Sequence, residues 1–241
     1  MIKSSNKYVL KRIITIIILL LFIYVEYNDN LKGTFSKPTY SISNIPDYSG
    51  DDYIIINNNE PEFDDLAKTT NSFEVYSELD ELGRCGVAYA NIGKDLMPTK
   101  DRESIRMIKP SGWKTVRYDI ITDGLYLYNR CHLIGYQLAG ENANEKNLIT
   151  GTRYLNVQGM LPFENEVADY IKNQNKNEDK HVLYRVTPIF ENSNLVASGV
   201  QMEAYSIEDN GQGVCFNVYV YNAQPGIEIN YANGESSYVE K

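Results

Sequence analysis

Residues 128–137 read YNRCHLIGYQ, and they place a fixed cation, Arg130, two residues before an imidazole, His132. The chain has only two histidines, His132 and His181. An unperturbed imidazole titrates near neutral pH, so His132 is well suited to act as a general base. A guanidinium binds phosphate or carboxylate through paired hydrogen bonds and keeps its charge, so Arg130 indicates an anionic substrate. On residue types alone, a hydrogen-bonded histidine at a strand end beside a surface arginine is the more common arrangement.

Two later segments extend this pattern. Residues 152–156 read TRYLN, and residues 161–167 read LPFENEV. Together with the first stretch, they resemble the DNA/RNA non-specific endonucleases, a branch of the ββα-metal (His-Me finger) nucleases. The signature of that family is Asp-Arg-Gly-His, then an asparagine that holds one magnesium ion, then a glutamate on the following helix.

Four residues of this chain match the signature. Arg130 and His132 stand at its second and fourth positions, and Asn156 and Glu164 match the asparagine and the glutamate. The resemblance runs from about residue 45 to the C-terminus and is closest to cell-surface and secreted nucleases of Gram-positive bacteria, of the DNA-entry type.

The chain departs from the signature at two positions. Asn129 stands where the family usually has aspartate, and Cys131 stands where it has glycine. Neither position carries the base in the family, so the expected activity is unchanged. The two departures do imply that the strand around His132 is supported by other contacts than in most members of the family.

The resemblance implies hydrolysis of phosphodiester bonds. His132 would be the general base, and Asn156 would hold one Mg²⁺, for which Mn²⁺ may substitute. Glu164 would hold the waters of that ion, and Arg130 would bind the scissile phosphate. Arg153 is a weaker candidate for a phosphate contact. Such a site contacts the nucleic-acid backbone rather than the base edges, which implies low sequence specificity. The expected substrate is DNA, and RNA is a second candidate.

Composition limits the alternatives. A net charge of −9 argues against a tight, persistent DNA-binding module, because non-specific affinity comes mainly from lysine and arginine. The charge is compatible with an enzyme that has a local cationic cleft. The 241 residues allow one sizeable domain with an appendage. The three cysteines are too few for a disulfide scaffold, although one bridge is possible in an exported protein; they are Cys85, Cys131 and Cys215.

Other classes of function remain open at this point. One is a catalytically inactive cell-surface nucleic-acid-binding module with the same fold, which the acidic total and the two signature departures favour. Another is a thiol enzyme that uses Cys131 with His132, but adjacent strand residues point to opposite faces. A zinc site built from Cys131, His132 and the other cysteines lacks the usual ligand spacing. The sequence indicates no protein partner.

The N-terminus has the pattern of an export segment. Four cations precede an apolar run over residues 13–25; they are Lys3, Lys7, Lys11 and Arg12. No small-x-small cleavage site follows, so we expect residues 1–27 to be an uncleaved signal-anchor with its N-terminus inside, or else a signal peptide. Residues 28–44 are polar and predict a linker. Residues 45–241 would then form an extracytoplasmic nuclease domain.

Local patterns predict an α+β fold with a mixed, mainly antiparallel sheet. The turn Thr122-Asp123-Gly124 lies between runs rich in β-branched and aromatic residues at 114–121 and 125–128, which predicts a hairpin that ends just before His132. We also expect a partly helical stretch over residues 63–82. Strands are expected at residues 53–56, 85–91, 148–150, 182–190, 196–206, 214–221 and 227–231.

A second helix is predicted at residues 161–173, where apolar residues fall on one face and Pro162 suits the first turn. Glu164 lies in that turn, off the apolar stripe, where a surface glutamate that complements the helix dipole would also be ordinary. Strict alternation over residues 214–221 predicts a strand with one buried face. His181 reads as a structural histidine at a strand edge.

Overall fold

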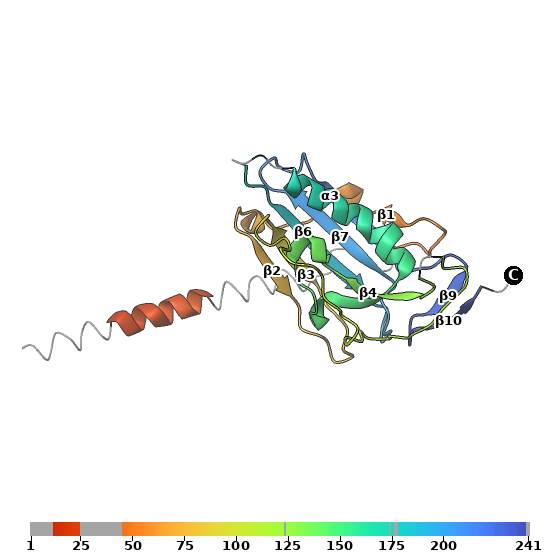
Figure 1. Ribbon diagram of the computed structural model, residues 1–241. Coiled ribbons are helices and arrows are strands. Elements are labelled where there is room, and N and C mark those ends of the chain that lie inside the picture. Colours follow the sequence, from red (N-terminus) through yellow and green to blue (C-terminus); the bar gives the residue numbers. More distant parts are fainter. Residues whose placement is uncertain (1–11, 25–44, 123, 174, 176–177, 240–241) are drawn as a thin grey trace, which may run out of the picture. The chain divides into compact units, whose positions relative to one another are not determined.

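The structure is a computed structural model that describes residues 12–24, 45–122, 124–173, 175, 178–239 (Figure 1). It divides into two compact units, Met1–Lys37 and Pro38–Lys241. In the first unit, residues 12–24 are helical. The rest of the predicted anchor and the whole of the predicted linker, residues 28–44, lie outside the described residues. Among the helices that the structure describes, none combines the length and hydropathy needed to cross a membrane.

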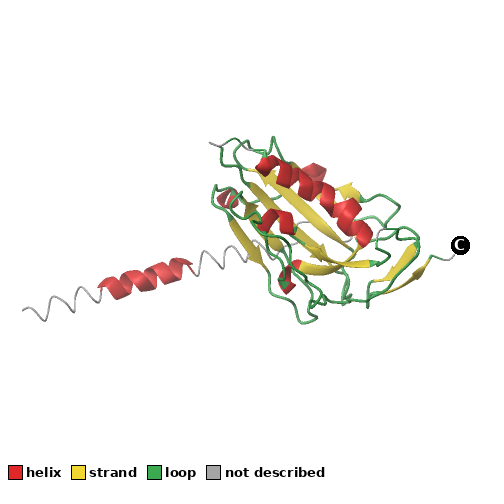
Figure 2. Cartoon of the chain, in the orientation of Figure 1, coloured by secondary structure: helices red, strands yellow, loops and turns green. Residues whose placement is uncertain are grey.

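A sheet forms the centre of the second unit (Figure 2). Within the described residues it has six strands, and each pairs antiparallel with its neighbour. In spatial order they are β1 (Tyr53–Ile55), β8 (Cys215–Tyr221), β7 (Gly199–Ser206), β6 (Val182–Ile189), β3 (Ala88–Ile92) and β2 (Phe73–Tyr76). The expected α+β class with a mainly antiparallel sheet is confirmed.

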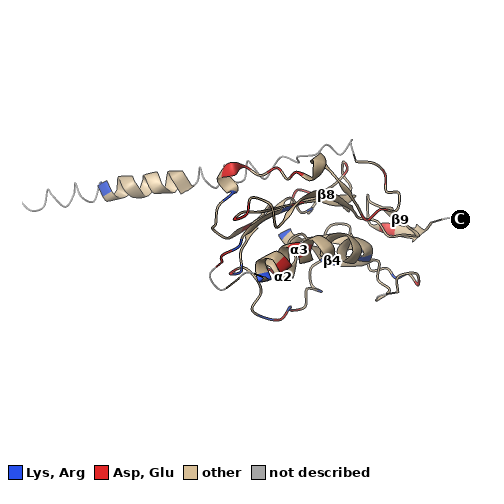
Figure 3. Ribbon diagram, turned by 90° about the horizontal axis from the view of Figure 1, so that it is seen from above, with Lys and Arg blue, Asp and Glu red and all other residues tan. Residues whose placement is uncertain are grey.

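A helical layer and a short hairpin cover one face of this sheet (Figure 3). The hairpin is made of β4 (Tyr128–His132) and β5 (Leu148–Thr152). It is followed by a π-helix, η5 (Leu155–Met160), which continues into α3 (Leu161–Lys172). Val167 and Ile171 on α3 are fully buried against aliphatic residues of the sheet. The short helix α2 (Tyr136–Ala139) follows β4.

The opposite face of the sheet is covered by the chain around β1, which corrects one expectation. Strand β8 was predicted to bury one face, but nearly all of its residues are buried. Asn217 donates to the backbone of Glu60 at 2.8 Å, and its backbone N–H donates to Asn59 at 3.1 Å. The face of β8 that carries Asn217 is therefore covered by another segment of the chain and not by solvent. That segment contains two 3-10 turns, η2 (Asn57–Asn59) and η3 (Asp65–Ala67).

Two other predictions were wrong in part. Residues 63–82 contain only the short turn η3 as helix, and residues 73–76 are strand β2. The predicted hairpin at residues 114–128 is reduced to one isolated bridge, Arg117 with Tyr126, and β4 takes β5 as its partner instead. The predicted strand at residues 227–231 forms β9 (Ile227–Asn230), which pairs with β10 (Glu235–Tyr238), and η4 (Glu145–Asn147) precedes β5.

Candidate active site

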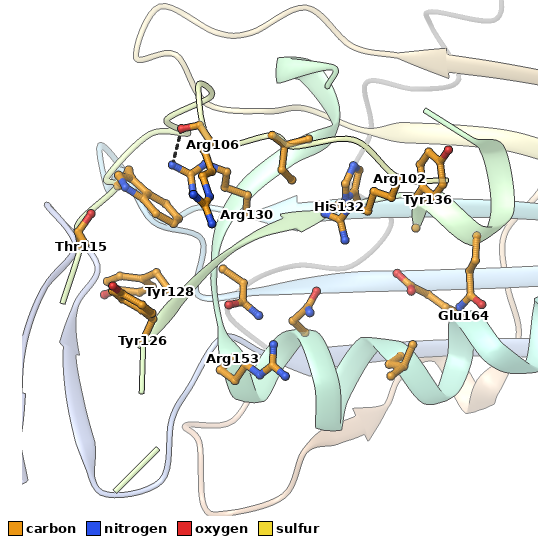
Figure 4. Close-up of a pocket in the computed structure, with 17 residues that line it drawn as sticks. Arg102, Arg106, Thr115, Tyr126, Tyr128, Arg130, His132, Tyr136, Arg153 and Glu164 are labelled. Carbon is orange, nitrogen blue, oxygen red and sulfur yellow. Dashed lines mark hydrogen bonds between the residues drawn. The ribbon is translucent and has the colours of Figure 1, made fainter. Parts of the chain in front are cut away.

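A cleft of about 920 Å³ opens between the start of α3, strand β4 and the loop that precedes it (Figure 4). All five residues that the sequence singled out line this cleft; they are Arg130, His132, Arg153, Asn156 and Glu164. They come from β4, from the helical turn that directly follows β5, from the π-helix and from the first turn of α3. The ββα arrangement therefore brings together residues that lie up to 34 positions apart in the chain (164 − 130).

Strand β4 presents His132 at its last position, opposite Leu148 of β5. The chain after His132 is fixed by Asn147, whose side chain is fully buried. Its Oδ1 accepts from the backbone N–H of Ile134 at 2.8 Å, and its Nδ2 donates to the carbonyl of Ile134 at 3.0 Å. The histidine therefore stands on a rigid hairpin and not, as predicted, just past a hairpin of residues 114–128.

The hydrogen bonds of His132 define its tautomer. Nε2 lies 2.8 Å from the carbonyl oxygen of Asn142, which can only accept, so Nε2 carries the proton. Nδ1 lies 3.3 Å from a guanidinium nitrogen of Arg102, which can only donate, so Nδ1 carries the lone pair. Burial lowers the pKa of His132 to about 4, and Arg102 acts in the same direction. The imidazole is therefore neutral at physiological pH.

Glu164 faces the same cleft from the first turn of α3. Burial raises the pKa of its carboxyl group to about 7, against the opposing effects of Gln137 and Arg102. Gly135 lies directly against this carboxylate: a Cβ atom at Gly135 would lie 2.6 Å from Oε2 of Glu164. A side chain at residue 135 would therefore displace the carboxylate of Glu164 from this position.

Asn156 lies on the π-helix, a rare widened turn that is frequent at functional sites. Within the described residues its side chain makes no hydrogen bond, although it lines a polar cleft. Glu164 likewise has no ion-pair partner among them. An amide oxygen and a carboxylate are the hard oxygen donors that Mg²⁺ prefers, and Mg²⁺ accepts few protein ligands. The residues present therefore fit a magnesium site.

Arg130 is held in place at the other side of the cleft. Its Nη2 donates to the carbonyl of Arg106 at 2.9 Å, and its Nε donates to the carbonyl of Ile108. The guanidinium also lies over the ring of Trp113, with Cζ 4.0 Å from the ring centroid. Burial lowers the pKa of Arg130, and Arg106 adds to this, but a guanidinium stays charged in proteins.

Comparison with known proteins shows which family the chain belongs to. Residues 65–208 match the family model described as DNA/RNA non-specific endonuclease. The chain belongs to that family. Family membership confirms the resemblance that the signature residues suggested.

Two proteins from Streptococcus are among the relatives of this chain. A deoxyribonuclease of Streptococcus dysgalactiae subsp. equisimilis is 28% identical over an alignment of 208 residues that covers 69% of this chain and 61% of the relative. The chain thus spans 61% of that relative's length. The crystal structure of NucA from Streptococcus agalactiae with a magnesium ion bound matches with a TM-score of 0.70 and 25% identity, over 89% of this chain and 96% of that one. The Sda1 nuclease with a bound zinc ion matches with a TM-score of 0.56 and 30% identity, over 70% and 81%.

Sequence reasoning missed several residues of the cleft. Arg102 and Arg106 come from the exposed loop before β4, and Trp113, Tyr126 and Tyr136 also line the cleft. No local pattern marks these positions, because a solvated loop with alternating charges is ordinary. Only the fold shows that residue 102 lies beside His132.

In the described residues, the cysteines form neither the thiol active site nor the zinc site that the sequence left open. All three are free thiols, and Cys131 is fully buried in the core. Burial strongly raises the pKa of its thiol, so Cys131 is not a nucleophile. Its sulfur packs on β5, where a Cβ at Gly151 would lie 2.3 Å away, so Gly151 makes room for the cysteine that replaces the signature glycine. In the described part of the chain, no three His, Cys, Asp or Glu side chains gather as a metal site.

His181 lies outside the cleft. It is buried at the start of β6, and its Nδ1 lies 2.8 Å from a carboxylate oxygen of Glu208. The same carboxylate accepts from the backbone N–H of His181 at 2.7 Å. This contact fits the structural role that we expected.

Proposed function

We propose that this protein is a metal-dependent endonuclease that hydrolyses phosphodiester bonds of DNA, and of RNA as a second substrate, without sequence specificity. One observation carries the proposal: a neutral imidazole with its lone pair facing a cleft shares that cleft with an amide that has no hydrogen bond among the described residues, a half-buried carboxylate and several arginines.

His132 is suited to be the general base. The Asn142 carbonyl fixes the tautomer, so Nδ1 is the atom that removes the proton from the attacking water. Because the pKa of His132 is lowered to about 4, the base is unprotonated over the whole neutral range. Arg102 is exposed and lies on a loop, so it can pair with a phosphate that arrives beside Nδ1.

Asn156 and Glu164 would hold one Mg²⁺, with Mn²⁺ as a substitute. Asn156 offers a direct amide ligand, and Glu164 can accept hydrogen bonds from waters around the ion. A cation bound there stabilises negative charge on the phosphate and on the leaving oxygen. The magnesium-bound structure of the Streptococcus agalactiae relative supports this choice, and the zinc ion in the Sda1 structure shows that a relative accepts another ion.

The arginines of the cleft would bind the nucleic-acid backbone. Arg130 is fixed by backbone carbonyls and by Trp113, so it can receive the scissile phosphate without reorganising. Arg153 is a second phosphate contact from the start of the helical segment. Contacts of this kind position the substrate but carry no sequence information, which supports a non-specific nuclease.

The proposed location is outside the cytoplasmic membrane, with residues 1–27 as a signal-anchor or signal peptide. Support comes from the cationic flank and the apolar run. Protease treatment of intact cells that express the full chain tests this: the second unit should be cleaved in intact cells. Full protection until the cells are lysed would overturn the proposal.

The activity is tested by plasmid degradation with the full chain in Mg²⁺, in EDTA and after thiol alkylation. We expect activity that EDTA abolishes and alkylation leaves unchanged, since the buried thiol of Cys131 takes no part. Binding of DNA without cleavage under every metal condition would instead support the inactive binding module.

A further inference from the structure

The cleft is lined by residues beyond those proposed for hydrolysis. Figure 4 shows His132, Arg102 and Glu164 toward one end, and Tyr126, Tyr128 and Thr115 at the other. Arg130 and Arg153 lie between the two ends. The rings of Tyr126 and Tyr128 line the far end, and the ring of Tyr136 lies beside Arg102 at the catalytic end.

The aromatic end is held rigidly. Tyr128 is buried, and its hydroxyl donates to the carbonyl of Gly234 at 3.1 Å. Together with Trp113 it packs on a small core beside β9 and β10. Trp113 is also covered by the Arg130 guanidinium. A preformed wall of this kind costs little to order when a ligand arrives.

Tyr126 is the exposed member of this wall. Its side chain is 46% exposed although it lines the cleft. The Arg117 guanidinium backs the ring at 5.0 Å from its centroid, and an isolated bridge pairs the backbones of the two residues. The preceding residue, Leu125, has a φ of 64°, a conformation that is rare for leucine.

We propose that Tyr126 forms a base-stacking subsite that receives an unpaired nucleobase of the strand bound in the cleft. This proposal rests on the proposed nuclease function and adds a preference among its substrates, for single-stranded nucleic acid or a locally unpaired strand. Arginines that bind the backbone beside aromatic rings that stack bases are the recurring features of single-strand binding sites. In a duplex the bases stack on one another, so no base can enter unless it is first unpaired.

Stacking on one aromatic ring changes affinity by about tenfold or more. We therefore expect Tyr126→Ala to lower the ratio of kcat/KM on a single-stranded oligonucleotide to kcat/KM on plasmid duplex by about tenfold, through KM. Tyr126→Phe keeps the ring and should keep the ratio. Tyr238→Ala is the matched control, because Tyr238 is 50% exposed and packs on Tyr118.

A second measurement locates the base. In an end-labelled single strand, one abasic position is moved along the sequence and the cleavage pattern is recorded. The wild type should show a gap in cleavage at a fixed offset from the abasic position, and Tyr126→Ala should lose that gap. An unchanged ratio and an unchanged pattern in a well-folded Tyr126→Ala protein would overturn the subsite.

Binding gives a readout that does not depend on cleavage. Trp113 is the single tryptophan of the chain and lines the cleft under Arg130, so its fluorescence reports on binding in this part of the cleft. In EDTA, a thymidine oligonucleotide should quench the emission, and an oligonucleotide of abasic units of equal length should not. If the wild type cuts nothing, the nuclease proposal fails while quenching still tests the subsite; equal quenching by both oligonucleotides overturns the subsite even in an active nuclease.

Discussion

The backbone carbonyl of Asn142 accepts a hydrogen bond of 2.8 Å from Nε2 of His132, and this bond determines which nitrogen can act on the substrate. The carbonyl orients the ring and fixes the proton on Nε2. The lone pair of Nδ1 is thereby directed to the cleft, where the arginines and the predicted metal ligands lie. One backbone contact thus links the hairpin to the chemistry that we propose.

Gly135→Ala tests the packing of Glu164. The backbone at Gly135 has a φ of −57°, which alanine adopts without strain, so only the close carboxylate opposes the new methyl group. We expect displacement of Glu164 and a loss in kcat of about a hundredfold with little loss of stability. In a Glu164→Ala background the same substitution should cost no further activity. Additive losses in the double variant would show that Gly135 acts in another way.

Asn156→Ala should abolish metal-dependent cleavage while the thermal midpoint in EDTA stays unchanged. The amide makes no hydrogen bond among the described residues, so its removal leaves no protein group unpaired. Asn156→Asp retains an oxygen ligand and should recover part of the rate. The comparison is a titration of cleavage rate against Mg²⁺ for the three proteins; a wild-type rate for Asn156→Ala at saturating Mg²⁺ would remove Asn156 from the metal site.

Stability should report the proposed link between Glu164 and the metal. The folded pKa of Glu164, about 7, lies above its ordinary value. The folded state thus favours the neutral carboxyl group of Glu164. This preference stabilises the fold fully below the pKa of the unfolded chain, and the stabilisation is lost as pH rises through about 7. Mg²⁺ should offset this loss, so the rise in Tm on adding Mg²⁺ should be larger at about pH 8 than at about pH 5.5. In Glu164→Gln, Mg²⁺ should raise Tm equally at the two pH values. An equal rise in the wild type would contradict the proposed link between Glu164 and the metal.

Asn147→Ala should be among the costly substitutions outside the cleft. It leaves the N–H and carbonyl of Ile134 buried without their partners, which should lower the free energy of unfolding by about 2 to 4 kcal/mol. Asn165→Ala is the control, because Asn165 is exposed and its hydrogen bond to Gln137 lies at the surface. Urea denaturation measures both variants; equal losses would mean that the Asn147 bonds contribute little.

The residues proposed for catalysis could be singled out from the sequence, because their chemistry depends on residue type. Arg130, His132, Asn156 and Glu164 indicated the family, and the structure places them in one cleft with Arg153, while their roles stay predictions. The helix from residue 161 was also predictable, since its apolar periodicity and Pro162 are local signals.

Contacts between distant segments account for the failures. The Asp-Gly turn predicted a hairpin before His132, but β4 pairs with β5, sixteen or more residues further on (148 − 132). The polar face of β8 looked solvent-exposed because Asn59 and Glu60, which cover Asn217, lie more than 150 positions earlier. Arg102 and Tyr126 likewise gain their significance only from what they face in the fold.

The central claim is that His132 is the base, and chemical rescue tests it most directly. General-base removal costs about a hundredfold to ten-thousandfold, so His132→Gly should be nearly inactive and leave a hole at the ring position. Free imidazole should restore part of the rate, and the rescue should rise with pH through the titration of imidazole, because only its neutral form is a base. The thermal midpoint and the imidazole dose response are measured on one preparation. A folded His132→Gly protein that imidazole rescues in this way agrees with the account, whereas a folded variant that keeps nearly the wild-type rate without imidazole contradicts it.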